Sequence, residues 1–154
     1  MSETTNVYLE NKCNELHISV IVCDITSLTE LISGQNYILN LGNNSHWVGL
    51  ACLDNSIYYF DSFGVPPPIR IMDLIKKLVC KTSKPIGYHY NTIQIQNLQS
   101  GYCGLYSLLF LYFMNRSKGT TTSRFKRFQN LFDEDVEKNK TILVEKLHKI
   151  GFYN

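Results

Sequence analysis

The chain has 154 residues, of which 44% are hydrophobic and 12% aromatic, and its formal net charge is +2. This length suits one folded domain with its own core, so we expect a single domain over residues 1–154. The small net charge argues against nucleic-acid binding driven by overall charge. The longest apolar run, residues 105–114, is too short for the about 20 residues of a membrane span, and we expect neither a membrane segment nor a signal peptide.

Apolar periodicity predicts a first helix, three strands and a hairpin. Asp24 is a candidate cap for a short helix that ends at Gly34. A tight turn is predicted at Asp54-Asn55, between two strands that form a hairpin. The strands are predicted over residues 36–41, 46–53 and 56–60, with a further turn over 42–45.

The second half of the chain predicts three helices and two short strands. Prolines 66–68 open a helix with Ile69, Met72, Ile75 and Val79 along one face and Leu74 and Leu78 beside them. Short strands are expected at 86–90 and 92–95, and further helices at 103–115 and about 133–150. The helix over 103–115 is apolar nearly all round, so it should lie in the middle of the fold. The interleaved elements predict an α+β architecture.

The five cysteines show no repeated spacing; they are Cys13, Cys23, Cys52, Cys80 and Cys103. An odd number without close pairs is typical of free thiols in a reducing compartment, so we expect an intracellular protein. Cys13, His17 and Cys23 supply only part of a zinc ligand set, and we expect no metal site.

Cys103 stands within Gly101-Tyr102-Cys103-Gly104, at the start of the predicted central helix. The helix dipole and the unpaired N–H groups of the first turn favour a thiolate at this position. Taken alone, a buried cysteine is more often inert packing. The hypothesis of a nucleophile therefore depends on the residues that the fold brings to it.

His46 and Asp61 are predicted to lie at adjacent ends of the hairpin, fifteen positions apart with the turn near the middle. Asp61 can then accept a hydrogen bond from one imidazole nitrogen while the other nitrogen faces Cys103. Gln96, seven positions before the cysteine, can supply an oxyanion-hole donor together with the backbone N–H of Cys103. These four residues predict a cysteine hydrolase.

A substrate groove is expected beside the nucleophile. Gly101 and Gly104 permit close approach of a substrate backbone, Trp47 is expected both in the core and in the groove, and Tyr102 would line the groove. An extended peptide suits this arrangement.

Three segments of the chain resemble the adenovirus-type cysteine protease family, adenain: His-Trp-Val at 46–48, Tyr-Tyr-Phe-Asp-Ser-Phe-Gly at 58–64, and a glutamine seven positions before Cys-Gly at 103–104. The resemblance spans about residues 46–114. It is nearest to the maturation proteases of virophages and Maverick or Polinton elements, and more distant to the SUMO-type deconjugating proteases of the same clan. The order is reversed relative to papain, in which the cysteine precedes the histidine.

The resemblance implies a papain-like cysteine protease fold of the adenain/SUMO-protease type, with a mixed sheet packed against a buried central helix that carries the nucleophile. It implies Cys103 as nucleophile, His46 as ion-pair partner and general acid/base, Asp61 as its orienter and Gln96 in the oxyanion hole. Adenain commonly has glutamate at the third position, whereas the SUMO-type proteases have aspartate.

The family's role implies a cysteine endopeptidase that cleaves viral capsid and core precursors, beside small residues such as glycine, during virion maturation. We accordingly expect a monomer in the infected host cell and the virion, with viral structural precursors as substrates and no required cofactor. The adenoviral enzyme is stimulated by DNA and by a disulfide-linked viral peptide. Only Cys80 loosely matches the peptide-pairing cysteine, so such activation stays open.

A basic cluster follows the central helix, comprising Lys118, Arg124, Lys126 and Arg127. Acidic residues come close behind it, so a solvated surface is the favoured interpretation, and a DNA contact the alternative. Two other functions stay open for the whole chain: an isopeptidase that removes ubiquitin-like modifiers, and a catalytically silent module that binds peptide or DNA.

Overall fold

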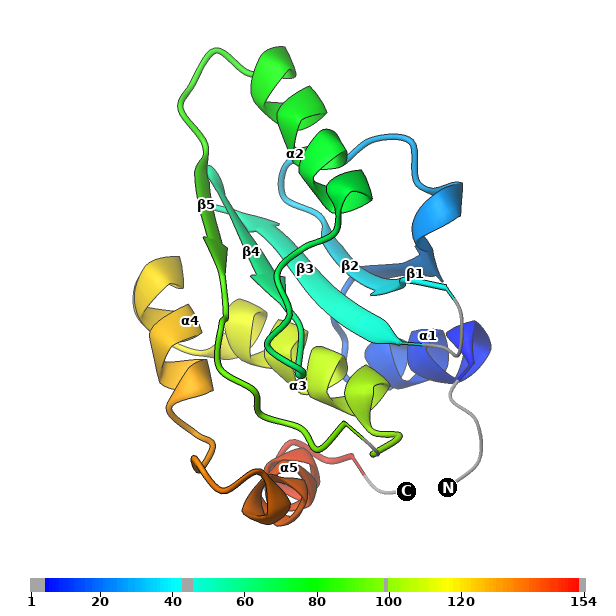
Figure 1. The fold of residues 1–154 in the computed structure, drawn as a ribbon, viewed down its shortest axis with the longest axis vertical. Helices are drawn as coiled ribbons and strands as arrows, with labels where there is room; N and C mark the ends of the chain where they lie inside the picture. The colour runs from blue at the N-terminus through cyan, green and yellow to red at the C-terminus, as the bar shows by residue number, and fades with distance from the viewer. Residues whose placement is uncertain (1–4, 43–45, 99, 153–154) are drawn as a thin grey trace.

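The computed structural model describes residues 5–42, 46–98 and 100–152, and its centre is a mixed five-stranded sheet (Figure 1). The strands lie in the order of the chain: β1 (Val20–Asp24), β2 (Asn36–Asn40), β3 (Trp47–Leu53), β4 (Ser56–Phe60) and β5 (Gly87–Tyr90). The inner pairs, β2 with β3 and β3 with β4, are antiparallel, while β1 and β5 join the edges in parallel. The predicted α+β class and mixed sheet are confirmed.

Helices cover both faces of this sheet. The helices α1 (Asn6–Glu15), α3 (Cys103–Arg116), α4 (Thr121–Gln129) and α5 (Val136–Lys149) share one hydrophobic cluster, and α2 (Ile69–Lys81) packs into another. Strand β3 contributes to both clusters because its side chains alternate: Trp47 and Ala51 join the first cluster, and Val48 and Leu50 the second. Figure 1 shows α3 running below the sheet and α2 in the upper part of the view.

The predicted central helix is α3, and the sheet packs directly onto it. Its residues from Cys103 to Leu111 are buried. Gly49 of β3 permits the close contact, since a Cβ atom there would lie 2.6 Å from the Phe110 side chain. Strand β3 and helix α3 therefore lie in close contact at Gly49 and Phe110.

The hairpin of β3 and β4 follows the sequence pattern closely. Asp54 and Asn55 both have positive φ, 51° and 58°, as a two-residue turn of type I′ requires. Strand β4 has the predicted bounds, and β3 begins one residue later than predicted. This hairpin brings the residues before β3 next to those after β4.

The short helix predicted over residues 24–34 is wrong. Asp24 ends β1 instead, and only one 3-10 turn, Ile25–Ser27, follows it. Leu28 is already extended, and the N–H of Ile32 donates to the Tyr37 hydroxyl at 2.9 Å. The apolar residues of this segment pack singly against the α2 side of the sheet, which leaves no helical stripe.

Other local predictions also need correction. In α2, Leu74, Ile75 and Leu78 are buried as predicted, but Ile71 completes this face, and Ile69 and Val79 are 80% and 44% exposed. The expected strand over 92–95 is an irregular segment, and α1, β1 and α4 have no counterpart among the predicted elements. The turn predicted over 42–45 lies largely outside the described residues. No helix in the described ranges is long and apolar enough to cross a bilayer.

Candidate active site

His46 and Asp61 meet at the open end of the hairpin. His46 immediately precedes β3 and Asp61 immediately follows β4. The His46 Nε2 atom lies 2.9 Å from Asp61 Oδ1, with the imidazole side chain 19% exposed and the carboxylate 2%. The hydrogen bond is thus shielded from water while the ring keeps one accessible edge.

Asp61 is fixed by its own loop and by Asn91. Its Oδ1 also accepts the backbone N–H of Phe63 at 2.8 Å. The Asn91 side chain spans the Asp61 backbone: its Oδ1 accepts from Asp61 N at 2.9 Å and its Nδ2 donates to Asp61 O at 2.6 Å. The sequence offered no signal for Asn91, because thirty positions separate it from Asp61 and an isolated asparagine after a strand usually marks a turn.

The His46 ring is held in place by Phe63 and carries a raised pKa. The two rings stack with centroids 4.4 Å apart and an interplanar angle of 6°. Burial lowers the pKa of His46, but the hydrogen bond with Asp61 and the interaction with the Cys103 side chain outweigh it and raise the pKa to about 9. Because Asp61 occupies Nε2, the buried Nδ1 is the nitrogen left for the cysteine.

Cys103 is the first residue of α3 and is 7% exposed. The backbone N–H of Trp47 donates to its sulfur at 3.4 Å, and the Ser107 hydroxyl donates to its carbonyl oxygen at 2.9 Å. A backbone donor and the helix N-terminus both favour negative charge on the sulfur. The residue after His46 thus supports the sulfur through its main chain.

Gln96 lies buried, 1% exposed, on the segment that leads to α3. Its Oε1 accepts from the Ser62 hydroxyl at 2.5 Å, and its Nε2 donates to the backbone carbonyl of Ser100 at 2.7 Å. The carboxamide is therefore held at both ends. Its amide group has two hydrogens, and the bond to Ser100 uses one of them.

The four expected groove residues lie in different surroundings. The indole of Trp47 is 1% exposed and packs in the core, so the expectation that it lines a groove is wrong. Gly104 is likewise buried in the first turn of α3. Gly101 is exposed and Tyr102 half-buried, immediately before the cysteine.

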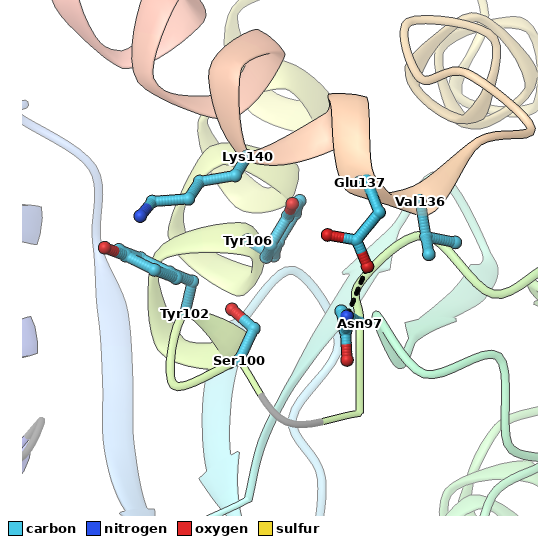
Figure 2. A pocket seen from close by; sticks show the side chains of 7 residues that line it. All are labelled: Asn97, Ser100, Tyr102, Tyr106, Val136, Glu137 and Lys140. Atoms are coloured by element: carbon cyan, nitrogen blue, oxygen red, sulfur yellow. Dashed lines mark hydrogen bonds between the residues drawn. The ribbon is translucent and has the colours of Figure 1, made fainter.

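A pocket of about 250 Å³ opens next to Tyr102, between the loop before α3 and the start of α5 (Figure 2). The Lys140 ammonium lies 4.8 Å from the centroid of the Tyr102 ring. On the other side, the Asn97 amide donates to Glu137 at 2.5 Å. The lining residues are Asn97, Ser100, Tyr102, Tyr106, Val136, Glu137 and Lys140.

Two residues of the basic cluster are engaged at the corner between α3 and α4. Arg124 donates to the carbonyl oxygen of Met114 at 2.8 Å. Arg127 donates to the carbonyl oxygen of Lys118, and its guanidinium lies 5.6 Å from the Phe113 ring centroid. Lys118 and Lys126 have exposed side chains.

All five cysteines lie in the described ranges, and none forms a disulfide. Burial raises the pKa of Cys52 to about 12, and burial together with nearby Glu10 raises that of Cys13 to about 12. These thiols stay protonated and inert at neutral pH. In the described part of the chain, no three His, Cys, Asp or Glu side chains gather closely enough to hold a metal ion.

Comparison with protein families matches residues 36–147 to the Ulp1 protease family, C-terminal catalytic domain. Among solved structures, the chain is similar to the ASFV pS273R protease: in one structure the TM-score is 0.49 at 21% identity, over 74% of this chain and 42% of the other. In a selenomethionine form the TM-score is 0.56 at 20% identity, over 92% of this chain and 67% of the other. This chain thus spans less than half of the first structure and about two thirds of the second. Curated protein sequences give no significant match.

Proposed function

Because the chain belongs to the Ulp1 protease family and is a cysteine peptidase, we propose that it is an endopeptidase that cleaves viral structural precursors through Cys103, His46 and Asp61. The observation that carries the proposal is the buried bond of 2.9 Å between His46 and Asp61, beside a cysteine at a helix N-terminus. The viral role is supported by the adenain-like motifs and by the ASFV protease as a structural neighbour. We place its action in the infected cell and in the virion.

The proposed reaction begins with a thiolate–imidazolium pair. His46, with a pKa of about 9, is protonated at neutral pH, and the Cys103 sulfur is supported by the Trp47 N–H. The sulfur attacks the carbonyl carbon of the scissile peptide bond, and His46 gives its proton to the departing amine. This yields a thioester and a free amine. Water, deprotonated by His46, then hydrolyses the thioester and regenerates the thiolate.

The oxyanion formed in each step needs donors that are already in place. The backbone N–H of Cys103 and the second amide hydrogen of Gln96 are the proposed pair. The bonds to Ser62 and Ser100 hold the Gln96 carboxamide, so it does not have to be ordered during the reaction.

The pocket beside Tyr102 is the proposed site for a substrate side chain close to the scissile bond. Tyr102 precedes the nucleophile in the chain, so a peptide aligned on Cys103 passes this wall. Gly101, exposed at the same edge, allows a main chain to approach closely.

A deconjugating isopeptidase is the second candidate, and the family match is the observation that favours it. The same chemistry would cut the bond after the C-terminal glycine of a ubiquitin-like modifier. Such an enzyme needs a surface that recognises the folded modifier in addition to the groove for its tail.

Two substrates separate the candidates: a capsid precursor with a glycine-containing junction, and a ubiquitin-like fusion ending in Gly-Gly. The proposal predicts cleavage of the precursor by the wild type and none by Cys103→Ala, with Cys80→Ala as the matched control that keeps full activity. Turnover of the fusion alone would favour the isopeptidase. If the wild type cleaved neither substrate and iodoacetamide did not alkylate Cys103, the chain would be a catalytically silent module.

A further inference from the structure

We propose that Ser62 is a positioning residue that holds the Gln96 carboxamide in place and so prepares the oxyanion hole. Three hydrogen bonds join Ser62 to Ile95 and Gln96. The Ser62 carbonyl oxygen accepts the backbone N–H of Ile95 and that of Gln96, each at 2.9 Å, and the Ser62 hydroxyl donates to Gln96 Oε1 at 2.5 Å. One residue thus holds both the main chain and the side chain of Gln96.

The direction of these bonds follows from the chemistry of their partners. The Ser100 carbonyl oxygen, 2.7 Å from the Gln96 amide group, can only accept a hydrogen bond, so Nε2 must face it. Oε1 must then face Ser62, and the Ser62 hydroxyl must donate. A rotated carboxamide would place two acceptors against each other at Ser100, which makes this orientation the only one with both bonds.

Burial makes the contact strong and rigid. Ser62 is 0% exposed and Gln96 1%, so water does not compete for either group. Donation to Oε1 also polarises the amide and strengthens its N–H groups as donors. The bonds at both ends of the carboxamide thereby fix the direction of the second amide hydrogen.

Ser62 also directly follows Asp61 in the chain. Asp61 orients His46, and the next residue holds Gln96. The two residues that follow β4 therefore position both the acid/base and the proposed oxyanion donor. This inference rests on the proposed function, because the oxyanion hole has a purpose only in a peptidase.

Kinetics of Ser62→Ala, Gln96→Ala and the double variant test the inference, on a fluorogenic peptide that ends in Gly-Gly. We expect Ser62→Ala to lower kcat about 10-fold or more with KM changed less than about 2-fold, since a displaced donor affects the transition state more than binding. The double variant should be no slower than Gln96→Ala, because both changes remove the same interaction. Losses that multiply in the double variant would overturn the proposal.

The matched control is Thr121→Val, which removes another buried hydroxyl bond, that of Thr121 to the Tyr58 hydroxyl at 2.7 Å, away from the site. Thr121→Val should lower the melting temperature about as much as Ser62→Ala does, but it should leave kcat unchanged. If Ser62→Ala behaved like this control, Ser62 would be structural only.

A readout independent of activity is the side-chain amide resonance of Gln96 in a nitrogen-15 NMR spectrum, assigned by its loss in Gln96→Ala. We expect Ser62→Ala to shift this resonance and speed its hydrogen exchange, while Thr121→Val leaves it in place. If the wild type is active and the Gln96 resonance in Ser62→Ala is unchanged, the inference is overturned. A wild type that neither cleaves peptides nor reacts at Cys103 would instead reject the proposed function, and the resonance would still report whether Ser62 holds Gln96.

Discussion

Asp61 Oδ1 accepts two hydrogen bonds at once, from His46 Nε2 at 2.9 Å and from the Phe63 backbone at 2.8 Å. The Phe63 ring meanwhile stacks on the imidazole. The residue that fixes the carboxylate through its main chain therefore also fixes the imidazole through its side chain. This arrangement restricts rotation of the His46 ring and leaves its Nδ1 available for the sulfur.

The pH dependence of activity should follow His46. As the pH rises through about 9, the imidazolium loses its proton, so kcat/KM should fall on the alkaline side. Asp61→Asn keeps an acceptor oxygen but removes the negative charge that supports the imidazolium, so the pKa of His46 should fall, the alkaline limb should move to lower pH, and kcat should fall by on the order of 10²-fold. The pH–rate profile measures both effects.

The control for this variant is Asp54→Asn, the same chemical change in the exposed hairpin turn. Asparagine also tolerates positive φ, so the turn should persist and the profile should stay unchanged. An alkaline limb at the same pH in both variants would contradict the assigned role of Asp61.

Gly64 should be intolerant of any side chain. Its φ is +73°, and a Cβ atom would lie 2.8 Å from the backbone nitrogen of Gln94, on the segment that leads to Gln96. We expect Gly64→Ala to lower the unfolding free energy by about 2–4 kcal/mol, from backbone strain and the clash together, and to reduce kcat. Urea denaturation and steady-state kinetics measure the two effects.

Gly42→Ala separates strain from clash, since Gly42 has a similar φ of +89° but, among the described residues other than its chain neighbours, no atom lies within 4 Å of the added Cβ. This variant should lose about 1–2 kcal/mol and keep its kcat. Equal losses in the two variants would mean that contact with the segment before Gln96 is unimportant.

Tyr102 should affect substrate binding more than chemistry. Tyr102→Ala removes one wall of the pocket between the loop before α3 and the start of α5, so we expect KM to rise several-fold with a smaller change in kcat. The matched control is Tyr112→Ala, since Tyr112 is also a half-buried tyrosine with a cation over its ring, that of Arg116 at 6.0 Å, but lies near the far end of α3. Similar KM values for the two variants would exclude the pocket as a substrate site.

The alternative of a DNA contact by the basic cluster depends on Lys118 and Lys126, whose side chains are exposed next to the two engaged arginines. The double variant Lys118→Glu with Lys126→Glu should then lose the stimulation of its activity by duplex DNA. In the wild type, this stimulation should weaken steeply between 50 and 200 mM salt. Lys76→Glu with Lys77→Glu, on α2, is the control. If the stimulation by DNA did not change with salt concentration, phosphate contacts by the basic cluster would be excluded.

Sequence patterns predicted the parts of the site that depend on local geometry. The Asp54-Asn55 turn and the alternation of β3 and β4 fixed which hairpin ends meet, and the unbroken apolar run identified α3. The α1 helix left no such pattern, because only Leu9 and Cys13 of its residues are buried.

Contacts between distant, irregular segments were beyond prediction. The bond between Asn91 and Asp61, and that between Ser62 and Gln96, depend on how the loop after β5 folds back against the end of β4. Neither loop carries a periodic signal. Trp47 lies in the core as predicted but does not also line a groove, because the register of β3 directs its indole inward and leaves only its backbone N–H for the sulfur.

Alkylation by iodoacetamide at neutral pH, followed residue by residue with mass spectrometry, tests the central claim most directly. Cys80 is exposed and Cys103 only 7% exposed, so accessibility alone would label Cys80 first. A thiolate paired with His46 predicts that Cys103 reacts fastest, and that His46→Ala removes this advantage. Labelling of Cys80 ahead of Cys103, unchanged by His46→Ala, would contradict the assignment of Cys103 as the nucleophile.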